Sequence, residues 1–145
     1  MISTSGRKIL MQFVSDVKTL LTNNIISSLQ QHYGIWADGR VIPVSQLTTS
    51  NADIIYRARM LRGRLQYIKN SLPADSTDID KKAVQQLTAE QAFTILNRFC
   101  AVRMCEEREL IMPSIGDGYD SDGFVSYDMV TGQGSVGSRY ERYCW

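Results

Sequence analysis

The sequence AFTILNRFCAVRMCEERELI, residues 92–111, decides the fold class, because its apolar residues recur with the period of a helix. They cover most of the helix circumference, which predicts a helix at the centre of a helical bundle. The same stretch carries Asn97, Arg98 and Arg103 where a plain core helix would carry leucine. Buried polar side chains are normally hydrogen-bonded, so these three are expected to have partners in the fold.

Two further long helices are predicted upstream of this stretch. Apolar residues recur at helical spacing between about residues 5 and 33. A second helix is expected to begin after Ser50 or Asn51, both of which are good N-cap residues, and to end near Asn70. The segment between these two helices contains glycines and a proline and predicts a turn with an irregular connection.

The third helix is expected to run from about residue 89 to residue 109. Thr88-Ala-Glu-Gln91 matches a capping box at its start, and a separate short helical piece is expected at residues 81–86. The fold class predicted from these patterns is all-α, a helical bundle of about three long helices that occupies residues 1–112.

After Pro113 the composition changes, since six of the ten glycines lie between residues 116 and 137 among aspartates and serines. We interpret residues 113–138 as a long Gly- and Asp-rich loop, with a short extended piece at residues 124–130. Residues 139–145 are expected to start a further helix. These features suggest a fragment of a longer chain.

Composition excludes several classes of protein. Sixteen Lys and Arg residues balance fifteen Asp and Glu residues, so no global field favours a nucleic-acid or membrane partner. Cys100, Cys105 and Cys144 fit no disulfide framework and are interpreted as small buried hydrophobes. With His32 as the only histidine, no metal site and no Cys–His nucleophile pair are predicted. The absence of a signal-like or membrane-spanning segment predicts a cytoplasmic protein without a membrane partner.

One concentrated basic segment, residues 56–70, is the candidate DNA-binding element. By helix geometry, Arg59, Arg62 and Lys69 fall within a sector of about 80°. Three interpretations remain open: a solvated face, contact with a nucleic-acid backbone, and pairing with another protein domain. The candidate DNA-binding residues are Arg57, Arg59, Arg62, Arg64 and Lys69.

The stretch from Ala92 to Glu106 reads A-x-T-x-x-N-R-x-x-A-x-R-x-x-E. It resembles the N-terminal helical region of large adenine-specific DNA methyltransferases of bacterial phage-defence and restriction-modification systems, including the BREX (PglX-like) and DISARM types. In that family the pattern precedes the catalytic domain. The sequence HYGIWADG at residues 32–39 also resembles the family, and the resemblance covers roughly residues 5–40 and 88–111.

The resemblance implies a non-catalytic domain that supports the catalytic domain of the same polypeptide, and the basic segment at residues 56–70 is expected to contribute contacts to the DNA backbone. Its signature positions, Asn97, Arg98, Arg103 and Glu106, are expected to be structural. The full-length enzyme would use S-adenosylmethionine. This chain has neither a glycine-containing loop for that cofactor nor an Asn-Pro-Pro-Tyr-type motif, so it is expected to bind no cofactor and not to be an enzyme by itself.

Two alternatives come from other classes of protein. A protein–protein docking module of a defence complex, with other defence-system proteins as partners, would use the apolar and aromatic residues after Pro113. A free-standing helical regulator unrelated to methyltransferases would pack Trp145 into its fold.

Overall fold

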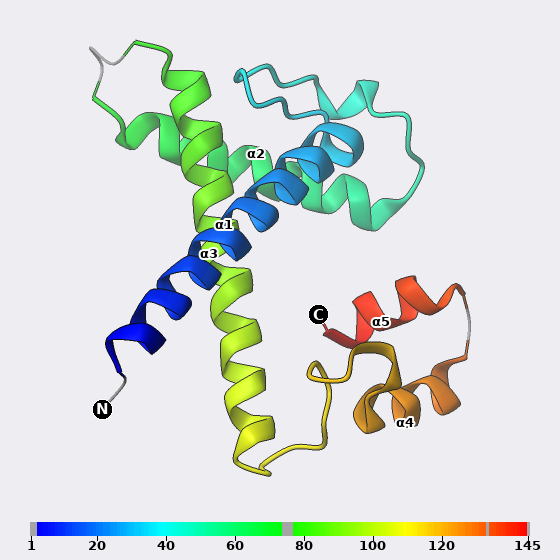
Figure 1. The fold of residues 1–145 in the computed structure, drawn as a ribbon. Helices are drawn as coiled ribbons and strands as arrows, with labels where there is room; N and C mark the ends of the chain where they lie inside the picture. The colour runs from blue at the N-terminus through cyan, green and yellow to red at the C-terminus, as the bar shows by residue number, and fades with distance from the viewer. Residues whose placement is uncertain (1–2, 74–76, 133, 145) are drawn as a thin grey trace. The chain divides into compact units, whose positions relative to one another are not determined.

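The computed structural model describes residues 3–73, 77–132 and 134–144, which form helices joined by turns (Figure 1). The described residues contain no strand, only an isolated antiparallel bridge between Ile35 and Val41. The predicted all-α fold class is therefore confirmed. The elements in chain order are α1 (Thr4–Tyr33), the 3-10 turn η1 (Val44–Gln46), α2 (Ala52–Ser71), α3 (Ile79–Glu107), the 3-10 turn η2 (Gly118–Asp120), α4 (Asp122–Thr131) and α5 (Val136–Cys144).

The chain divides into two compact units, residues 1–94 and residues 95–145. The division falls inside α3, whereas the sequence predicted a single bundle that ends at residue 112. The difference arises because the two parts of α3 serve different units. Its first turns bury Val84 and Leu87 in the core of the first unit, and its last turn buries Glu106 in the second.

The first two helices begin and end where the sequence predicted. The Ser3 side chain accepts a hydrogen bond from the Gly6 amide at 3.0 Å and caps α1, which stops at Gly34 in the left-handed conformation. Asn51 caps α2 by accepting from the amides of its first turn. Both helices therefore follow from their capping residues.

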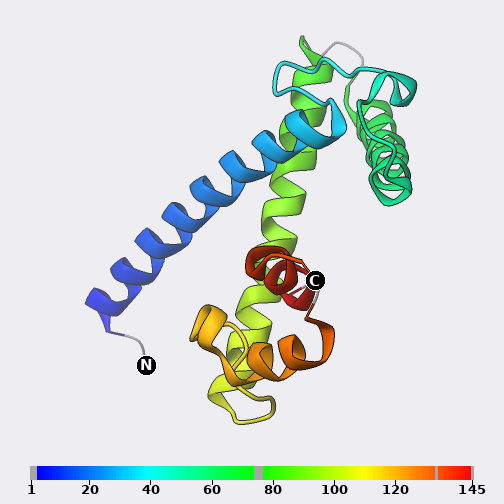
Figure 2. The same ribbon diagram turned by 90° about the vertical axis from the view of Figure 1, so that its right-hand side faces the viewer.

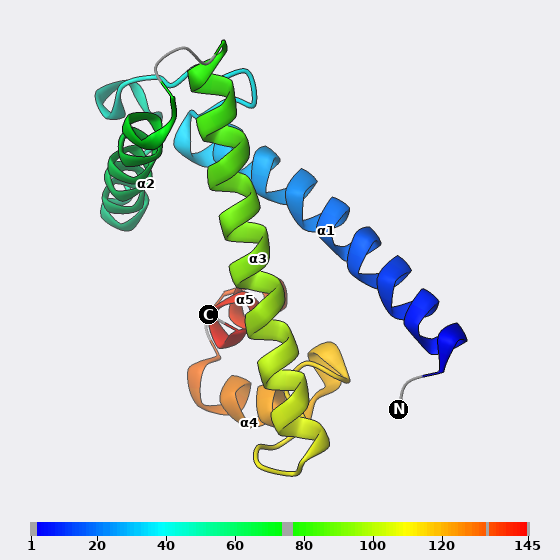
Figure 3. The same ribbon diagram turned by 90° about the vertical axis from the view of Figure 1, so that its left-hand side faces the viewer.

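The core of the first unit forms where the end of α1, the segment after it, α2 and the start of α3 meet (Figures 1 and 3). Apolar side chains from all four parts pack against one another. The buried members are Leu29, Ile35, Leu65, Ile68, Ala83, Val84 and Leu87.

The start of α3 corrects the prediction. The helix is continuous from Ile79, so the separate piece at residues 81–86 and the capping box at Thr88 were wrong. The Thr88 hydroxyl instead donates to the Val84 carbonyl at 2.8 Å, four residues earlier. Threonine is tolerated inside a helix in this way, and burial of Leu87 beside it holds the helix through the expected boundary.

Only the first turns of α3 have the central position predicted for the whole helix. Phe93 is 66% exposed and Met104 is 54% exposed. Cys100 is exposed too, and Cys105 is only partly buried, so the interpretation of the cysteines as core residues was wrong for Cys100. Apolar periodicity shows which face a helix has available, not how much of that face the chain covers.

Arg62 of α2 joins three segments of the first unit. Its guanidinium donates to the carbonyl of Ala58 at 2.8 Å, of Tyr33 at 2.8 Å and of Ile42 at 2.7 Å. Tyr33 ends α1, where carbonyls lack a partner within the helix. Burial lowers the pKa of Arg62, but arginine remains charged at neutral pH and keeps all its donors.

Gly39 lets the bend after α1 approach the start of α3. It has a φ of +97°, and an added Cβ would lie 2.6 Å from the Cβ of Asp80 and 2.8 Å from the amide nitrogen of Lys81. The bend is closed by a hydrogen bond from the Trp36 amide to the Arg40 carbonyl at 2.9 Å. Glycine is therefore needed at position 39 both for its backbone conformation and for space.

The second unit corrects the prediction for residues 113–138. In place of a continuous loop with an extended piece it contains η2, α4 and the first turn of α5 (Figure 2). Phe124 is 2% exposed and anchors the helix that was expected to be extended. The glycines occupy boundaries, such as Gly132, which ends α4 in the left-handed conformation. The aromatic side chains that surround Phe124 are Tyr119, Tyr140 and Tyr143.

An ion pair between Asp128 and Arg139 joins α4 to α5, with one of its contacts at 3.0 Å.

Among the described residues no helix combines the length and apolar character that crossing a membrane requires. The expectation that Trp145 distinguishes a fragment from a complete regulator falls on a residue outside those described.

Replacing Arg62 with methionine should lower the free energy of unfolding of the first unit by about 3 kcal/mol, because three carbonyls lose a charged donor. Amide hydrogen exchange of α1 and α2 would measure the change. The control is Arg59→Met, an exposed arginine on the same helix, which should change stability by less than about 0.5 kcal/mol. Equal effects of both substitutions would show that Arg62 does not hold the unit together.

Gly39→Ala should destabilise the first unit by about 2 kcal/mol, because the new Cβ meets backbone at a positive φ. Thermal unfolding followed by circular dichroism measures this. Gly63→Ala is the matched control: Gly63 lies inside α2 with no atom within 4 Å of its added Cβ, so alanine should stabilise by about 1 kcal/mol. A Gly39→Ala protein that is as stable as Gly63→Ala would contradict the close approach.

Candidate functional site

The basic residues of α2 separate into two sets. Members of the internal set bind other groups of the first unit, and members of the external set have no such partner among the described residues. Arg62 is bound to carbonyls as described above. Arg64 pairs with Glu90 of α3 at 2.9 Å and lies over the Tyr67 ring at 5.0 Å. Lys69 pairs with Asp80 at 2.6 Å, and 23% of its side chain is exposed. These three cations therefore contribute to the packing of α2.

Arg57 and Arg59 form the external set. Both are exposed, and within the described residues no carboxylate pairs with either. Tyr56, which is 64% exposed, lies between them on the outer face of α2, because helix geometry places Arg57 about 100° to one side of it and Arg59 about 60° to the other. Arg57 and Arg59 are therefore about 160° apart around α2, and each is a separate exposed cation that suits contact with a phosphate.

The sector predicted from sequence, Arg59, Arg62 and Lys69, therefore does not act as one surface. Only Arg59 of the three has a guanidinium or ammonium group without an internal partner in the described part of the chain. A helical wheel could not show that Tyr33 would lie within reach of Arg62, or Asp80 within reach of Lys69.

Glu106 is the centre of a polar network in the second unit. Its side chain is 2% exposed and accepts from Arg103 Nη1 at 2.8 Å and from the amides of Ser114 and Ile115 at 2.5 Å each. Burial tends to raise the pKa of Glu106, but the hydrogen bonds from Arg103, Ile115 and Ser114 outweigh it and hold the pKa below its ordinary value. A charged carboxylate thus fixes the chain that follows α3.

Of the four signature positions, Arg103 and Glu106 pair with each other. Arg103 bridges Glu106 and Glu107, and the hydrogen bond to Glu106 raises the pKa of Arg103. Asn97 and Arg98 are exposed on α3. Arg103 and Glu106 therefore fix the chain after α3, and the role of all four positions as a family signature stays a prediction.

Ser114 accepts three further hydrogen bonds that the sequence did not predict. Its carbonyl accepts from the hydroxyls of Ser121 at 2.9 Å and Tyr140 at 3.3 Å, and its own hydroxyl accepts from Tyr143 at 2.5 Å. Burial, together with the nearby Cys144, raises the pKa of Tyr140 to about 12. The available signal was the spacing of Tyr140 and Tyr143, which places both on one face of a helix.

Cys144 does not supply a nucleophile. Burial raises the pKa of its thiol, and a hydrogen bond with Tyr140 offsets this only in part. A thiol with a raised pKa stays protonated at neutral pH, and the thiolate is the reactive form. The surroundings of Cys144 therefore favour a packing role.

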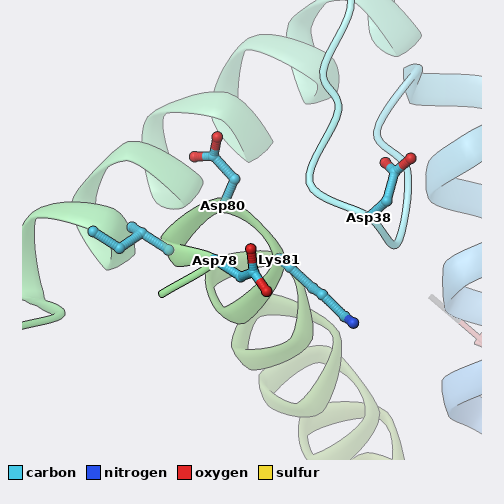
Figure 4. Close-up of a pocket in the computed structure, with 5 residues that line it drawn as sticks. Asp38, Asp78, Asp80 and Lys81 are labelled. Atoms are coloured by element: carbon cyan, nitrogen blue, oxygen red, sulfur yellow. The ribbon is translucent and has the colours of Figure 1, made fainter. Parts of the chain in front are cut away.

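An open depression of about 560 Å³ lies at the start of α3. Figure 4 shows that the carboxylates of Asp38, Asp78 and Asp80 point in different directions and do not converge on a common point. Asp38 is paired with Arg40 at 2.8 Å, and Asp80 with Lys69 at 2.6 Å. The depression therefore offers a cation or substrate no shared ligand set.

No group of three or more His, Cys, Asp or Glu side chains that could hold a metal ion is present in the described part of the chain. Comparisons with protein-family models, with curated proteins and with solved structures find no match to this chain. The described residues therefore offer two candidate functional features, the exposed arginines of α2 and the Glu106 network.

Glu106→Gln should destabilise the second unit by about 2–3 kcal/mol at pH 7, because a neutral side chain loses charge-assisted hydrogen bonds. The folded carboxyl has a lowered pKa, so its contribution is complete above the pKa of free glutamate, about 4.3, and is lost as the pH falls through the folded pKa. The difference between wild type and Glu106→Gln should therefore shrink below pH 4.

Hydrogen exchange of α4 and α5 amides across pH 3–7, read at equal intrinsic exchange rates, would measure this difference. The control is Glu107→Gln, which removes a carboxylate whose side chain is 64% exposed and should cost less than about 0.5 kcal/mol. A pH-independent difference between wild type and Glu106→Gln would show that the carboxylate is not charged in the folded protein.

Proposed function

We propose that this chain is a non-catalytic N-terminal helical domain of a DNA adenine methyltransferase in bacterial phage defence. It acts in the cytoplasm, supports the catalytic domain of the same polypeptide and contacts the DNA backbone through the exposed arginines of α2. The methyltransferase chemistry and S-adenosylmethionine belong to the catalytic domain.

The observation that carries the proposed link to this family is the Arg103–Glu106 network. Both residues belong to the pattern on which the resemblance rests, and both are used to fix the chain directly after α3. A domain that supports another domain needs its connecting segments held in one conformation. A buried ionised carboxylate bound to two successive amides supplies that rigidity.

The proposed contact with DNA rests on Arg57 and Arg59. A flexible arginine side chain on an exposed helix reaches phosphates without any contact to base edges, so binding would be independent of sequence. The internal partners of Arg62, Arg64 and Lys69 limit the number of phosphate contacts that α2 makes alone. The expected contribution of α2 is therefore modest and strongly dependent on salt.

A second candidate function is docking to another protein of a defence complex. The exposed end of α4 favours it, because Met129 is 82% exposed and Val130 is 85% exposed. The aromatic residues that suggested docking from sequence lie around Phe124 inside the second unit, so they do not carry this alternative.

Binding to a generic DNA duplex at two salt concentrations, measured by fluorescence anisotropy, tests the DNA contact. Arg57→Ala combined with Arg59→Ala should weaken binding at low salt about tenfold or more and reduce the slope of log K against log salt by about 1.8, since each phosphate contact contributes about 0.9.

Lys81→Ala combined with Lys82→Ala is the charge-matched control, because both lysines are exposed at the start of α3. It should leave most of the affinity and the slope in place. Equal losses in the two double variants would assign binding to net charge. A folded chain that does not bind DNA at low salt would remove the DNA contact and leave the support role alone.

A further inference from the structure

The first half of α1 is a solvent-exposed apolar helix. Between residues 7 and 20 every residue is exposed except Val17, which is intermediate. The contacts of α1 with the core come from its last turns, near Leu29. Figures 2 and 3 show the first turns of α1 continuing well beyond the region in which it meets α2.

The apolar side chains of this segment gather on one face. Helix geometry places them within a sector of about 140°. Leu10, Val14, Val17 and Leu21 follow the 4-3-4 spacing of the core positions of a coiled coil. We define the α1 stripe as Ile9, Leu10, Phe13, Val14, Val17, Leu20 and Leu21.

The α1 stripe contains no charged side chain, and its exposed members are large. Ile9 is 68% exposed, Phe13 is 54% exposed and Leu20 is 60% exposed. An isolated helix of about this length is marginal in water, so most of its stability has to come from packing. A continuous exposed stripe of this kind indicates an interaction surface.

The area of the α1 stripe is large enough for pairing with a second copy of this chain. If its exposed side chains each bury roughly 100 Å², two copies together bury about 1,000 Å², which is within the lower range of specific interfaces. A stripe that is apolar along its length complements itself, as a two-fold symmetric interface requires.

The charges beside the stripe favour a parallel pair. Lys18 lies on one side of the stripe and Asp16 lies on the other. In a parallel two-stranded coiled coil each side faces the opposite side of the partner, so Lys18 of one copy lies on the same side as Asp16 of the other. An antiparallel pair would place the Lys18 side of one copy against the Lys18 side of the other.

We propose that the α1 stripe is a homodimer interface, in which the first halves of two α1 helices pair in parallel. This pairing is independent of the proposed contact with DNA, which uses α2. It gives the first half of α1 the packing partner that the rest of the first unit does not provide.

Sedimentation equilibrium of the whole chain over a concentration series tests the proposal. The wild type should form dimers, and Phe13→Glu combined with Leu20→Glu should weaken dimerisation at least tenfold, because four carboxylates enter an apolar interface. Circular dichroism confirms that the variant is helical. A wild type that remains monomeric at all concentrations would overturn the proposal, since the stripe would then have no second copy on it.

The matched control is Gln12→Glu combined with Thr19→Glu. Both residues are exposed, they have the same seven-residue spacing as Phe13 and Leu20, and both positions point about 130–150° away from the centre of the stripe. This variant should dimerise like the wild type. Equal weakening by both double variants would attribute the effect to loss of helix and overturn the proposal.

A cross-link tests the parallel orientation. Leu10→Cys should form a disulfide between the two copies on mild oxidation, detected as a peptide linked through residue 10, whereas Met11→Cys should not. A dimer without the residue 10 cross-link would overturn the parallel arrangement.

Discussion

The arrangement of residues 1–94 depends on one guanidinium that gathers backbone carbonyls. A helix that ends at Tyr33 leaves carbonyls without partners, and the bend that follows adds the carbonyl of Ile42. Arg62 binds both and also the carbonyl of Ala58 in its own helix. Because the guanidinium has fixed donor geometry, it sets the positions of α1 and the bend relative to α2. The apolar core alone, which is non-directional, would not fix these positions.

In residues 95–145 the backbone groups that need partners are amides, and Glu106 is the side chain that binds them. There the chain leaves α3 through a turn whose amides need acceptors, so an anion takes the place of the cation. The carboxylate accepts from the amides of Ser114 and Ile115 and is balanced by Arg103. A buried charge is costly unless it is paired and hydrogen-bonded, and both conditions are met. In each unit, one ionised side chain therefore satisfies the backbone where a helix ends.

These roles also explain what the sequence could predict. Periodicity predicted α1 correctly, and periodicity together with the Asn51 cap predicted α2, because both signals are local. The predicted helix start at Thr88 was wrong because threonine occurs both in capping boxes and inside helices, where its hydroxyl donates to the carbonyl four residues earlier. Glycine content suggested a loop after Pro113, yet burial of Phe124 outweighed it. The partners of Arg62 and Glu106 depend on tertiary contacts that no local pattern encodes.

The same contacts change how the charge of the chain should be judged. Five cations in α2 suggested a strongly basic helix, but three of them bind carbonyls or carboxylates, and Arg57 and Arg59 remain outward. Two phosphate contacts per chain give weak binding at physiological salt. Pairing through α1 would double the number of such contacts without any change in α2, and linked sites gain affinity through effective concentration. The apolar face of α1 and the exposed arginines of α2 are therefore compatible features of the DNA-contacting domain proposed above.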